Sequence, residues 1–260
     1  MKKKSIRTKL AIDLFTLQGQ WTVWFLGIMF VVYIAHILYP ILFSGESGRT
    51  VDDFYARTYI FGNIYMLIIG IITSVSCLPY YVQNGITRRD YFFGATIGTL
   101  GLTIVIPLVA LIIRFLTKGI VDWINLPIEL KGLPDIHIAE EDPFIAQMIL
   151  AVIDAPSVVE TIELSILVFM VNLFFYYVIG WMIGSGFYRF GGINGLLFVA
   201  LALAIFLINA GIWGNPVPGW LPIPDLTLSS YVASIIGTVL LIFIVLGIIR
   251  LVTKNMRIKL

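Results

Sequence analysis

Few residues in this sequence have side chains suited to covalent or metal chemistry. There are two histidines, His36 and His137, and one cysteine, Cys77. The sequence has no G-x-x-x-x-G-K-[ST] phosphate loop, no H-E-x-x-H or paired C-x-x-C zinc motif, and no G-x-S-x-G nucleophile elbow. We therefore expect that the chain is not an enzyme, that it binds no cofactor or metal, and that it does not hydrolyse ATP by itself.

The residues best suited to recognition are three consecutive charges, Arg88, Arg89 and Asp90. They separate two runs, residues 58–87 and 91–113, that contain no other charged residue. Guanidinium groups make strong charge-assisted hydrogen bonds to carboxylates and phosphates, so this point of the chain could dock a partner. The same two arginines could instead be plain membrane anchors, and the pattern alone leaves both interpretations open.

The residues around these charges predict a short, rigid turn between two helices. Gly85 after Asn84 is typical of the end of a helix. Thr87 followed three residues later by Asp90 is a capping-box pattern, which starts the next helix at once. Both arginines are therefore expected at the tip of the turn.

Composition indicates which kind of secondary structure lies on either side of this turn. Hydrophobic residues make up 59% of the chain and charged residues 12%, with a mean hydropathy of +0.98, whereas about a quarter of the residues of a soluble domain are charged. Six runs without Asp, Glu, Lys or Arg each exceed the roughly 20 residues that cross a bilayer. They cover residues 21–43, 58–87, 91–113, 164–188, 190–224 and 226–249. We predict an all-α polytopic membrane protein with six transmembrane helices.

The distribution of basic residues predicts the orientation. If six helices alternate, twelve basic and two acidic residues lie on the side of the N-terminus, against five basic and thirteen acidic residues on the other side. Cytoplasmic loops are enriched in Lys and Arg, so both termini are expected in the cytoplasm. Residues 143–153 are too short for a seventh span, and we expect an interfacial helix there.

Two further segments are expected at the membrane surface. In a helix, residues 5–20 would place apolar side chains on one face and polar side chains on the other. This pattern predicts an N-terminal amphipathic interfacial helix. Residues 211–228 contain four prolines and predict a broken re-entrant hairpin before the last helix. The expected division is therefore residues 1–20 as the interfacial helix and 21–260 as the transmembrane domain, with an extracellular insertion at about 118–163.

The predicted spans contain small residues at helical spacing. Gly94 and Gly98, like Gly180 and Gly184, form G-x-x-x-G pairs that permit close helix approach. Packing within the chain is the favoured interpretation, and a dimer seam is the alternative. None of the six uncharged runs places a carboxylate or an arginine in the membrane interior, which argues against an ion-coupled transporter.

The turn resembles a known family. The sequence "QNGITRRDYFFG" is similar to the N-G-x-[ST]-R-[RK]-x-[FY] segment that joins the second and third helices in permeases of ABC-2-type ATP-binding-cassette exporters. The match covers Asn84, Gly85, Thr87, Arg88, Arg89 and Tyr91. Six spans, inner termini and a broken hairpin before the last helix also resemble that family, whereas the segment 118–163 is longer than in its compact members.

The resemblance implies a function. The chain would be the permease of an exporter in the bacterial cell membrane, moving a lipid, peptide or antibiotic by alternating access. The turn would couple it to a separate ABC ATPase subunit that binds ATP and Mg²⁺; the coupling residues would be Gln83, Asn84, Gly85, Ile86, Thr87, Arg88, Arg89, Asp90 and Tyr91. A second permease copy or a paralogue and membrane lipid are the other partners implied, and nucleic acid is not.

A different class of function stays open. The chain could be a non-transporting membrane sensor or assembly protein whose extracellular segment 118–163 binds a partner. A co-purifying ATPase would distinguish the exporter from this alternative.

Overall fold

The computed structural model describes residues 5–39, 49–124, 128–131, 162–214, 230–254 and 256. Within these residues six helical segments are long and apolar enough to cross a membrane. The predicted all-α fold with six spanning helices is confirmed, and the chain is a multi-pass membrane protein. The orientation of the termini stays a prediction. The expected hairpin falls mostly on residues 215–229, and the interfacial helix at 143–153 on residues 132–161, all of which lie outside the described residues.

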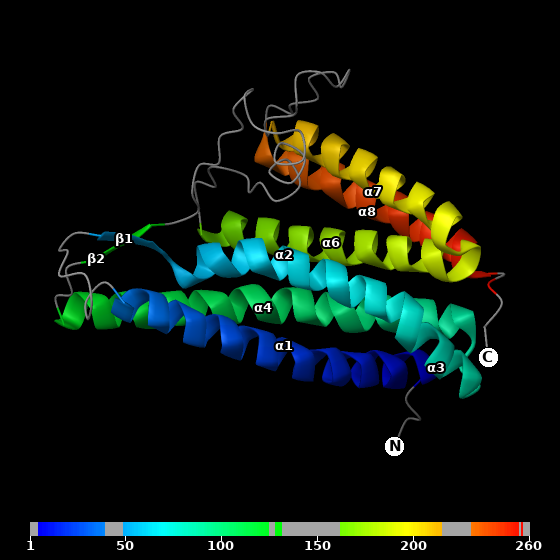
Figure 1. The fold of residues 1–260 in the computed structure, drawn as a ribbon, viewed down its shortest axis with the longest axis horizontal. Helices are drawn as coiled ribbons and strands as arrows, with labels where there is room; N and C mark the ends of the chain where they lie inside the picture. Colours follow the sequence, from blue (N-terminus) through cyan, green and yellow to red (C-terminus); the bar gives the residue numbers. More distant parts are fainter. Residues whose placement is uncertain are drawn as a thin grey trace.

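Figure 1 shows the elements in order along the chain. They are α1 (Ile6–Tyr39), β1 (Arg49–Asp52), α2 (Phe54–Ile72), the π-helical segment η2 (Thr73–Cys77), α3 (Leu78–Gln83), α4 (Arg88–Ile124), β2 (Ile128–Lys131), α6 (Ile162–Phe190), α7 (Gly192–Trp213) and α8 (Tyr231–Lys254). The segments α2, η2 and α3 follow one another without a break and form a single span.

The π-helical segment η2 has a local cause in the sequence. Pro79, at the start of α3, has no backbone N–H with which to continue the regular hydrogen bonds of the helix. Just before it, the hydroxyl of Thr73 donates to the Ile69 carbonyl and that of Ser74 to the Ile71 carbonyl. These side chains compete with the backbone of the helix, and the Leu78 N–H reaches back five residues to Thr73.

Helix α6 lies at the centre of the bundle. It packs against α2 on one side and against α7 and α8 on the other, while α1 packs against α4 (Figure 1). Glycines permit the close contact between α2 and α6. A Cβ atom on Gly180 would lie 2.0 Å from the carbonyl oxygen of Leu67, and a Cβ atom on Gly70 would lie 2.1 Å from the carbonyl oxygen of Tyr177. The backbones of α2 and α6 are therefore in direct contact.

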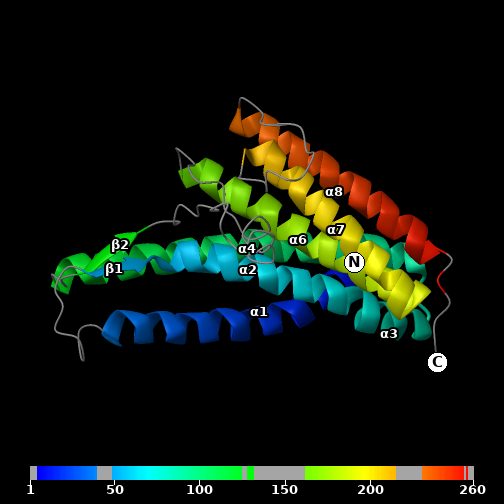
Figure 2. The same cartoon turned by 45° about the horizontal axis from the view of Figure 1, so that its top comes forward.

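The bundle has two different ends. We call the end with the α3–α4 turn the turn end, and the end with β1 and β2 the strand end. The two strands pair in parallel, with Arg49 opposite Ile128 and Asp52 opposite Lys131. Helices α1 and α4 continue to this pair, whereas α7 and α8 stop well short of it in both views (Figure 1 and Figure 2). The strand pair was not predicted.

Helix α1 differs from the sequence prediction. The helix expected over residues 5–20 is the first part of α1, which continues to Tyr39 without a break. Part of its apolar face is buried by protein, since Leu10 and Leu14 are buried and Leu10 lies against Gly94 of α4. An apolar stripe can be covered by a neighbouring helix as well as by lipid, and sequence periodicity does not distinguish the two. The position of this part of α1 at the membrane surface stays a prediction.

Helix α4 also extends further than predicted, to Ile124 instead of residue 113. The charged residues Arg114, Lys118 and Asp122 recur every four positions, so they share one face and the other faces remain apolar. Part of the expected insertion at 118–163 is thus helical, and four of its residues form β2.

Candidate functional site

The turn between α3 and α4 is closed by its own backbone. Helix α3 ends in a Schellman motif, in which the Ile86 N–H donates to the Tyr81 carbonyl at 3.0 Å and the Gly85 N–H to the Val82 carbonyl at 3.1 Å. Gly85 has φ 87°, a conformation that favours glycine. The Asn84 amide donates to the Tyr80 carbonyl at 2.7 Å. These hydrogen bonds fix the backbone at the end of α3.

The start of α4 has the predicted capping interaction. The Asp90 backbone N–H donates to the Thr87 hydroxyl oxygen at 3.1 Å, and that hydroxyl donates to the Asp90 carboxylate at 2.7 Å. Caps of this kind stabilise a helix by about 1 kcal/mol. Residues 83–91 therefore form a rigid connection that is continuous with two helices.

Helix α1 holds the turn from both sides. The Asp90 carboxylate accepts from Nε of Arg7 at 2.7 Å, and the Arg7 guanidinium lies 5.0 Å from the centre of the Phe93 ring. On the other side of the turn, the Tyr81 hydroxyl donates to the Asp13 carboxylate at 2.5 Å. A force on the turn would thus reach α1, α3 and α4 together. These contacts join residues 68 and 83 positions apart, so sequence analysis missed them.

The two arginines of the turn remain available to a partner. Arg89 is exposed and Arg88 is partly exposed. Neither side chain forms a hydrogen bond or ion pair with any residue that the structure describes. The only carboxylate of the turn, Asp90, is already bound to Arg7 and Thr87. The tip therefore presents two guanidinium groups without a hydrogen bond or ion pair to the described residues, and such groups suit an acidic protein surface or a phosphate.

A buried polar cluster connects the turn to the interior. The Tyr91 hydroxyl donates to the Thr73 carbonyl at 2.6 Å, at the start of η2. Gln18 of α1 donates to the Thr73 hydroxyl at 3.2 Å and accepts from Thr99 of α4 at 3.0 Å. We call these four residues the Thr73 cluster. All four are buried, so the last residue of the turn is tied to three helical segments.

The glycines predicted to support packing lie at contacts inside the chain. Gly94 and Gly98 of α4 face Leu10 and the Ala11 carbonyl of α1, and a Cβ atom on Gly184 of α6 would lie 2.8 Å from the Ile71 carbonyl oxygen. Gly180 meets α2 as described above. All four glycines are buried within the chain, and the neighbours they contact are α1, α2 and η2.

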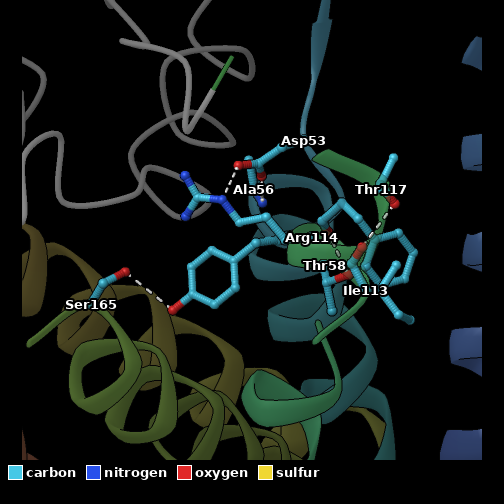
Figure 3. Close-up of polar contacts among 9 residues, drawn as sticks. Asp53, Ala56, Thr58, Ile113, Arg114, Thr117 and Ser165 are labelled. Carbon is cyan, nitrogen blue, oxygen red and sulfur yellow. Dashed lines mark hydrogen bonds and ion pairs between the residues drawn. The ribbon is translucent and has the colours of Figure 1, made fainter. Parts of the chain in front are cut away.

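A second charged cluster lies at the strand end, where none was predicted (Figure 3). Asp53 is the N-cap of α2 and accepts from the Ala56 N–H at 2.6 Å. Its buried carboxylate also pairs with Nε of Arg114 on α4 at 2.9 Å. Burial raises the pKa of Asp53 above its ordinary value of 3.8, although the Ala56 N–H and Arg114 oppose that shift.

This cluster reaches α6 and α1. The Arg114 guanidinium lies 5.9 Å from the centre of the Tyr55 ring, whose hydroxyl is 3.1 Å from that of Ser165 on α6 (Figure 3). Arg57 lies 5.9 Å from the Tyr33 ring of α1 and 4.0 Å from Asp52. The buried Nε atom of Arg57 has no hydrogen-bond partner among the described residues. One cationic donor is therefore unused within the described part of this end.

The strand-end cluster was not expected from the sequence, because Asp53, Arg57 and Arg114 all lie outside the six uncharged runs. The second uncharged run starts at residue 58, whereas α2 begins at Phe54 and includes Arg57. Asp53 itself could have been recognised from the sequence, because an aspartate directly before a helical run is a common N-cap. The pairing with Arg114, 61 positions away, could not be read from the sequence.

The described helices define a multi-pass membrane protein, and no group of three metal-binding side chains occurs among the described residues. Comparisons with protein-family models, curated proteins and solved structures found no match.

Proposed function

We propose that the chain is the permease subunit of an ABC-2-type transporter in the bacterial plasma membrane. It exports a hydrophobic or amphipathic substrate, driven by a separate ATPase subunit. The observation that supports this most is the turn at residues 83–91, which is rigid and is fixed to α1 on both sides. It carries two arginines that have no ion pair or hydrogen bond with the part of the chain that the structure describes. These are the properties needed to receive a mechanical input from a docked protein.

The contacts of the turn suggest how such an input would travel. Closure of the ATPase on ATP would displace the turn, and Arg7 and Asp13 would carry α1 along with it. Tyr91 would transmit the same displacement to Thr73, where the π-helical hydrogen bonds interrupt the regular helix. A tilt of α1, α3 and α4 relative to α6 would shift a pathway between two permease subunits from inward-open to outward-open.

The turn end is the cytoplasmic end in this proposal. Its basic residues include Arg88, Arg89, Arg189, Arg250 and Lys254, which agrees with the enrichment of Lys and Arg on the inner side of membranes. A cytoplasmic ATPase would then meet the two arginines of the turn directly.

Co-purification tests this proposal. The chain carries an affinity tag in its native host and is extracted from membranes in mild detergent, and the proteins retained with it are identified by mass spectrometry. We expect an ABC ATPase, and we expect ATP hydrolysis only in preparations that contain it. Hydrolysis by a preparation shown to contain this chain alone would refute the subunit assignment.

A further inference from the structure

Basic side chains of α4 and α8 converge at the turn end. The start of α4 and the end of α8 both lie there (Figure 1 and Figure 2), and the Arg250 guanidinium lies 5.8 Å from the centre of the Phe92 ring. Arg88 precedes Phe92 by four residues, and Lys254 follows Arg250 by four. Residues four apart share a helix face, and each of these steps leads about 6 Å further out of the bundle. Arg88, Arg250 and Lys254 therefore share one corner of the turn end, which we call the α4–α8 corner.

The charge of this corner is not neutralised within the part of the chain that the structure describes. Arg88, Arg250 and Lys254 form no ion pair there, and the buried Nη1 atom of Arg250 has no hydrogen-bond partner. The described carboxylates of the turn end, Asp13 and Asp90, are held in the contacts between α1 and the turn. Like charges four residues apart on a helix, such as Arg250 and Lys254, repel each other. An anion bound between them would remove that repulsion.

The end of α8 has another cation for its own carbonyl groups. Basic residues near a helix C-terminus commonly interact with the last carbonyls and the helix dipole. Here Arg189 of α6 fills that role, because its Nη1 donates to the Val252 carbonyl at 2.5 Å and to the Leu251 carbonyl at 3.2 Å. Arg250 and Lys254 make no such hydrogen bond with the described residues, so their cationic groups are left for an external anion.

An apolar strip of α8 leads from this corner into the membrane. Gly247 lies three residues before Arg250, and Phe243 lies seven before it, on the same side of the helix. Phe243 is 65% exposed, and a Cβ atom on Gly247 would meet nothing within 4 Å. A soluble anion could use only the cations of the corner. A molecule with an anionic head and an acyl chain would use the cations and the apolar strip together.

We propose that the α4–α8 corner binds an anionic phospholipid of the adjacent membrane leaflet. Its phosphate lies between Arg250 and Lys254, and Arg88 approaches it from α4. One acyl chain lies along Gly247 and Phe243. Guanidinium groups bind phosphate oxygens through paired hydrogen bonds, and basic pockets between membrane helices suit such head groups. The binding requires neither ATP nor an ATPase, so it is tested separately from the proposed function.

The test uses the full chain alone in a neutral detergent and measures lipid binding by native mass spectrometry. Phosphatidylglycerol is titrated, and we expect its Kd to be at least about tenfold below that of phosphatidylcholine, whose head group has no net charge. Lys254→Gln and Arg250→Gln should each raise the Kd for phosphatidylglycerol at least about fivefold, because a charge-assisted contact is lost. Lys254 is exposed, so its replacement tests the site without disturbing the packing of α8. Arg250→Lys keeps the charge and should have a smaller effect than Arg250→Gln.

A matched control and a soluble competitor complete the design. Lys9→Gln removes the same charge from an exposed residue of α1 at the turn end and should change the Kd by less than about twofold. Inorganic phosphate at the concentration of the lipid should not displace it, because phosphate makes no apolar contact with α8. Equal Kd values for the two lipids, or equal responses to Lys9→Gln and Lys254→Gln, overturn the proposed site. Displacement by equimolar phosphate would show a site for a soluble anion and overturn the role of the acyl chain.

Discussion

The Tyr91 hydroxyl donates a hydrogen bond of 2.6 Å to the carbonyl oxygen of Thr73, which also accepts the Leu78 N–H that closes the π-helical turn. Tyr91 is the last residue of the exposed turn, and Thr73 lies inside the bundle. One side chain thus connects the surface that would meet an ATPase with the irregular part of the second span.

Replacing Tyr91 by Phe keeps the aromatic ring against Trp181 and removes only the hydroxyl. A neutral hydrogen bond contributes about 0.5–1.5 kcal/mol, so we expect a small fall in thermal unfolding temperature in detergent. In the assembled transporter, ATP hydrolysis should continue while its stimulation by substrate weakens. Tyr80→Phe, which changes an exposed tyrosine of the same turn end, is the control. Equal stimulation in both variants would exclude Tyr91 from the coupling route.

Replacing Arg88 and Arg89 by Gln should weaken association with the ATPase by at least about tenfold, because charge-assisted contacts contribute about 1.5–3 kcal/mol each. Insertion should persist, since ten of the twelve basic residues assigned to the inner side remain. The measurement is the amount of ATPase retained per correctly oriented permease. Lys9→Gln/Lys254→Gln removes the same charge from exposed positions outside the turn. If both variants retain equal amounts, the arginines determine topology only.

The orientation of the bundle can be measured directly with single cysteines. In a Cys77→Ala background, a Lys118→Cys variant should react with an impermeant maleimide on intact cells, because the strand end is expected outside. A Lys254→Cys variant should react only after the cells are opened. Both residues are exposed in the structure, so access of the reagent does not depend on unfolding. Labelling of position 254 on intact cells would reverse the proposed topology.

Asp53 predicts a pH dependence of stability. Its pKa is raised in the folded protein, so the stability it contributes is present below pH 3.8 and is lost as the pH rises through the folded pKa. Asp53→Asn keeps an N-cap side chain but does not titrate. The unfolding temperature of the unmodified chain minus that of Asp53→Asn should therefore fall as the pH is raised from about 4. Asp122→Asn, at an exposed site on α4, serves as the control. A difference that rises with pH would show that Arg114 outweighs burial.

Gly180 should tolerate no side chain. The Cβ atom of Gly180→Ala would lie 2.0 Å from the Leu67 carbonyl oxygen, a contact with rigid backbone. Overpacking of this kind costs about 1–3 kcal/mol or more, so the thermal unfolding temperature should fall clearly. In contrast, a Cβ atom on Gly247 of α8 meets nothing within 4 Å. Gly247→Ala should raise stability by up to about 1 kcal/mol through helix propensity. A similar response from both variants would contradict the α2–α6 contact described above.

The sequence predicted well those features that depend on local pattern. Uncharged runs located the six spans, and Thr87 with Asp90 located the start of α4, because hydropathy and capping act over a few neighbouring residues. Boundaries were less accurate where a charge lies inside a helix. Arg57 and Arg114 were taken as the limits of spans, whereas in the structure each is a helical residue.

The contacts that assemble the candidate site could not be predicted, for a different reason. Asp13 lies within the amphipathic helix predicted over residues 5–20, and nothing in its sequence neighbourhood indicates that it accepts a hydrogen bond from Tyr81. The Asp53–Arg114 pair likewise depends on how α2 and α4 pack. Such pairings depend on tertiary geometry, which a single sequence does not encode as a local pattern.

The parallel pairing of β1 with β2 bears on the order of biosynthesis. Residue Arg49 leaves the translation machinery long before its partner Ile128, and two membrane helices must be inserted between them. Until then β1 is a strand edge without a partner, exposed to association with other chains. Insertion of α4 brings β2 alongside and closes that edge, so a nascent chain that stalls before residue 128 keeps it open to other chains.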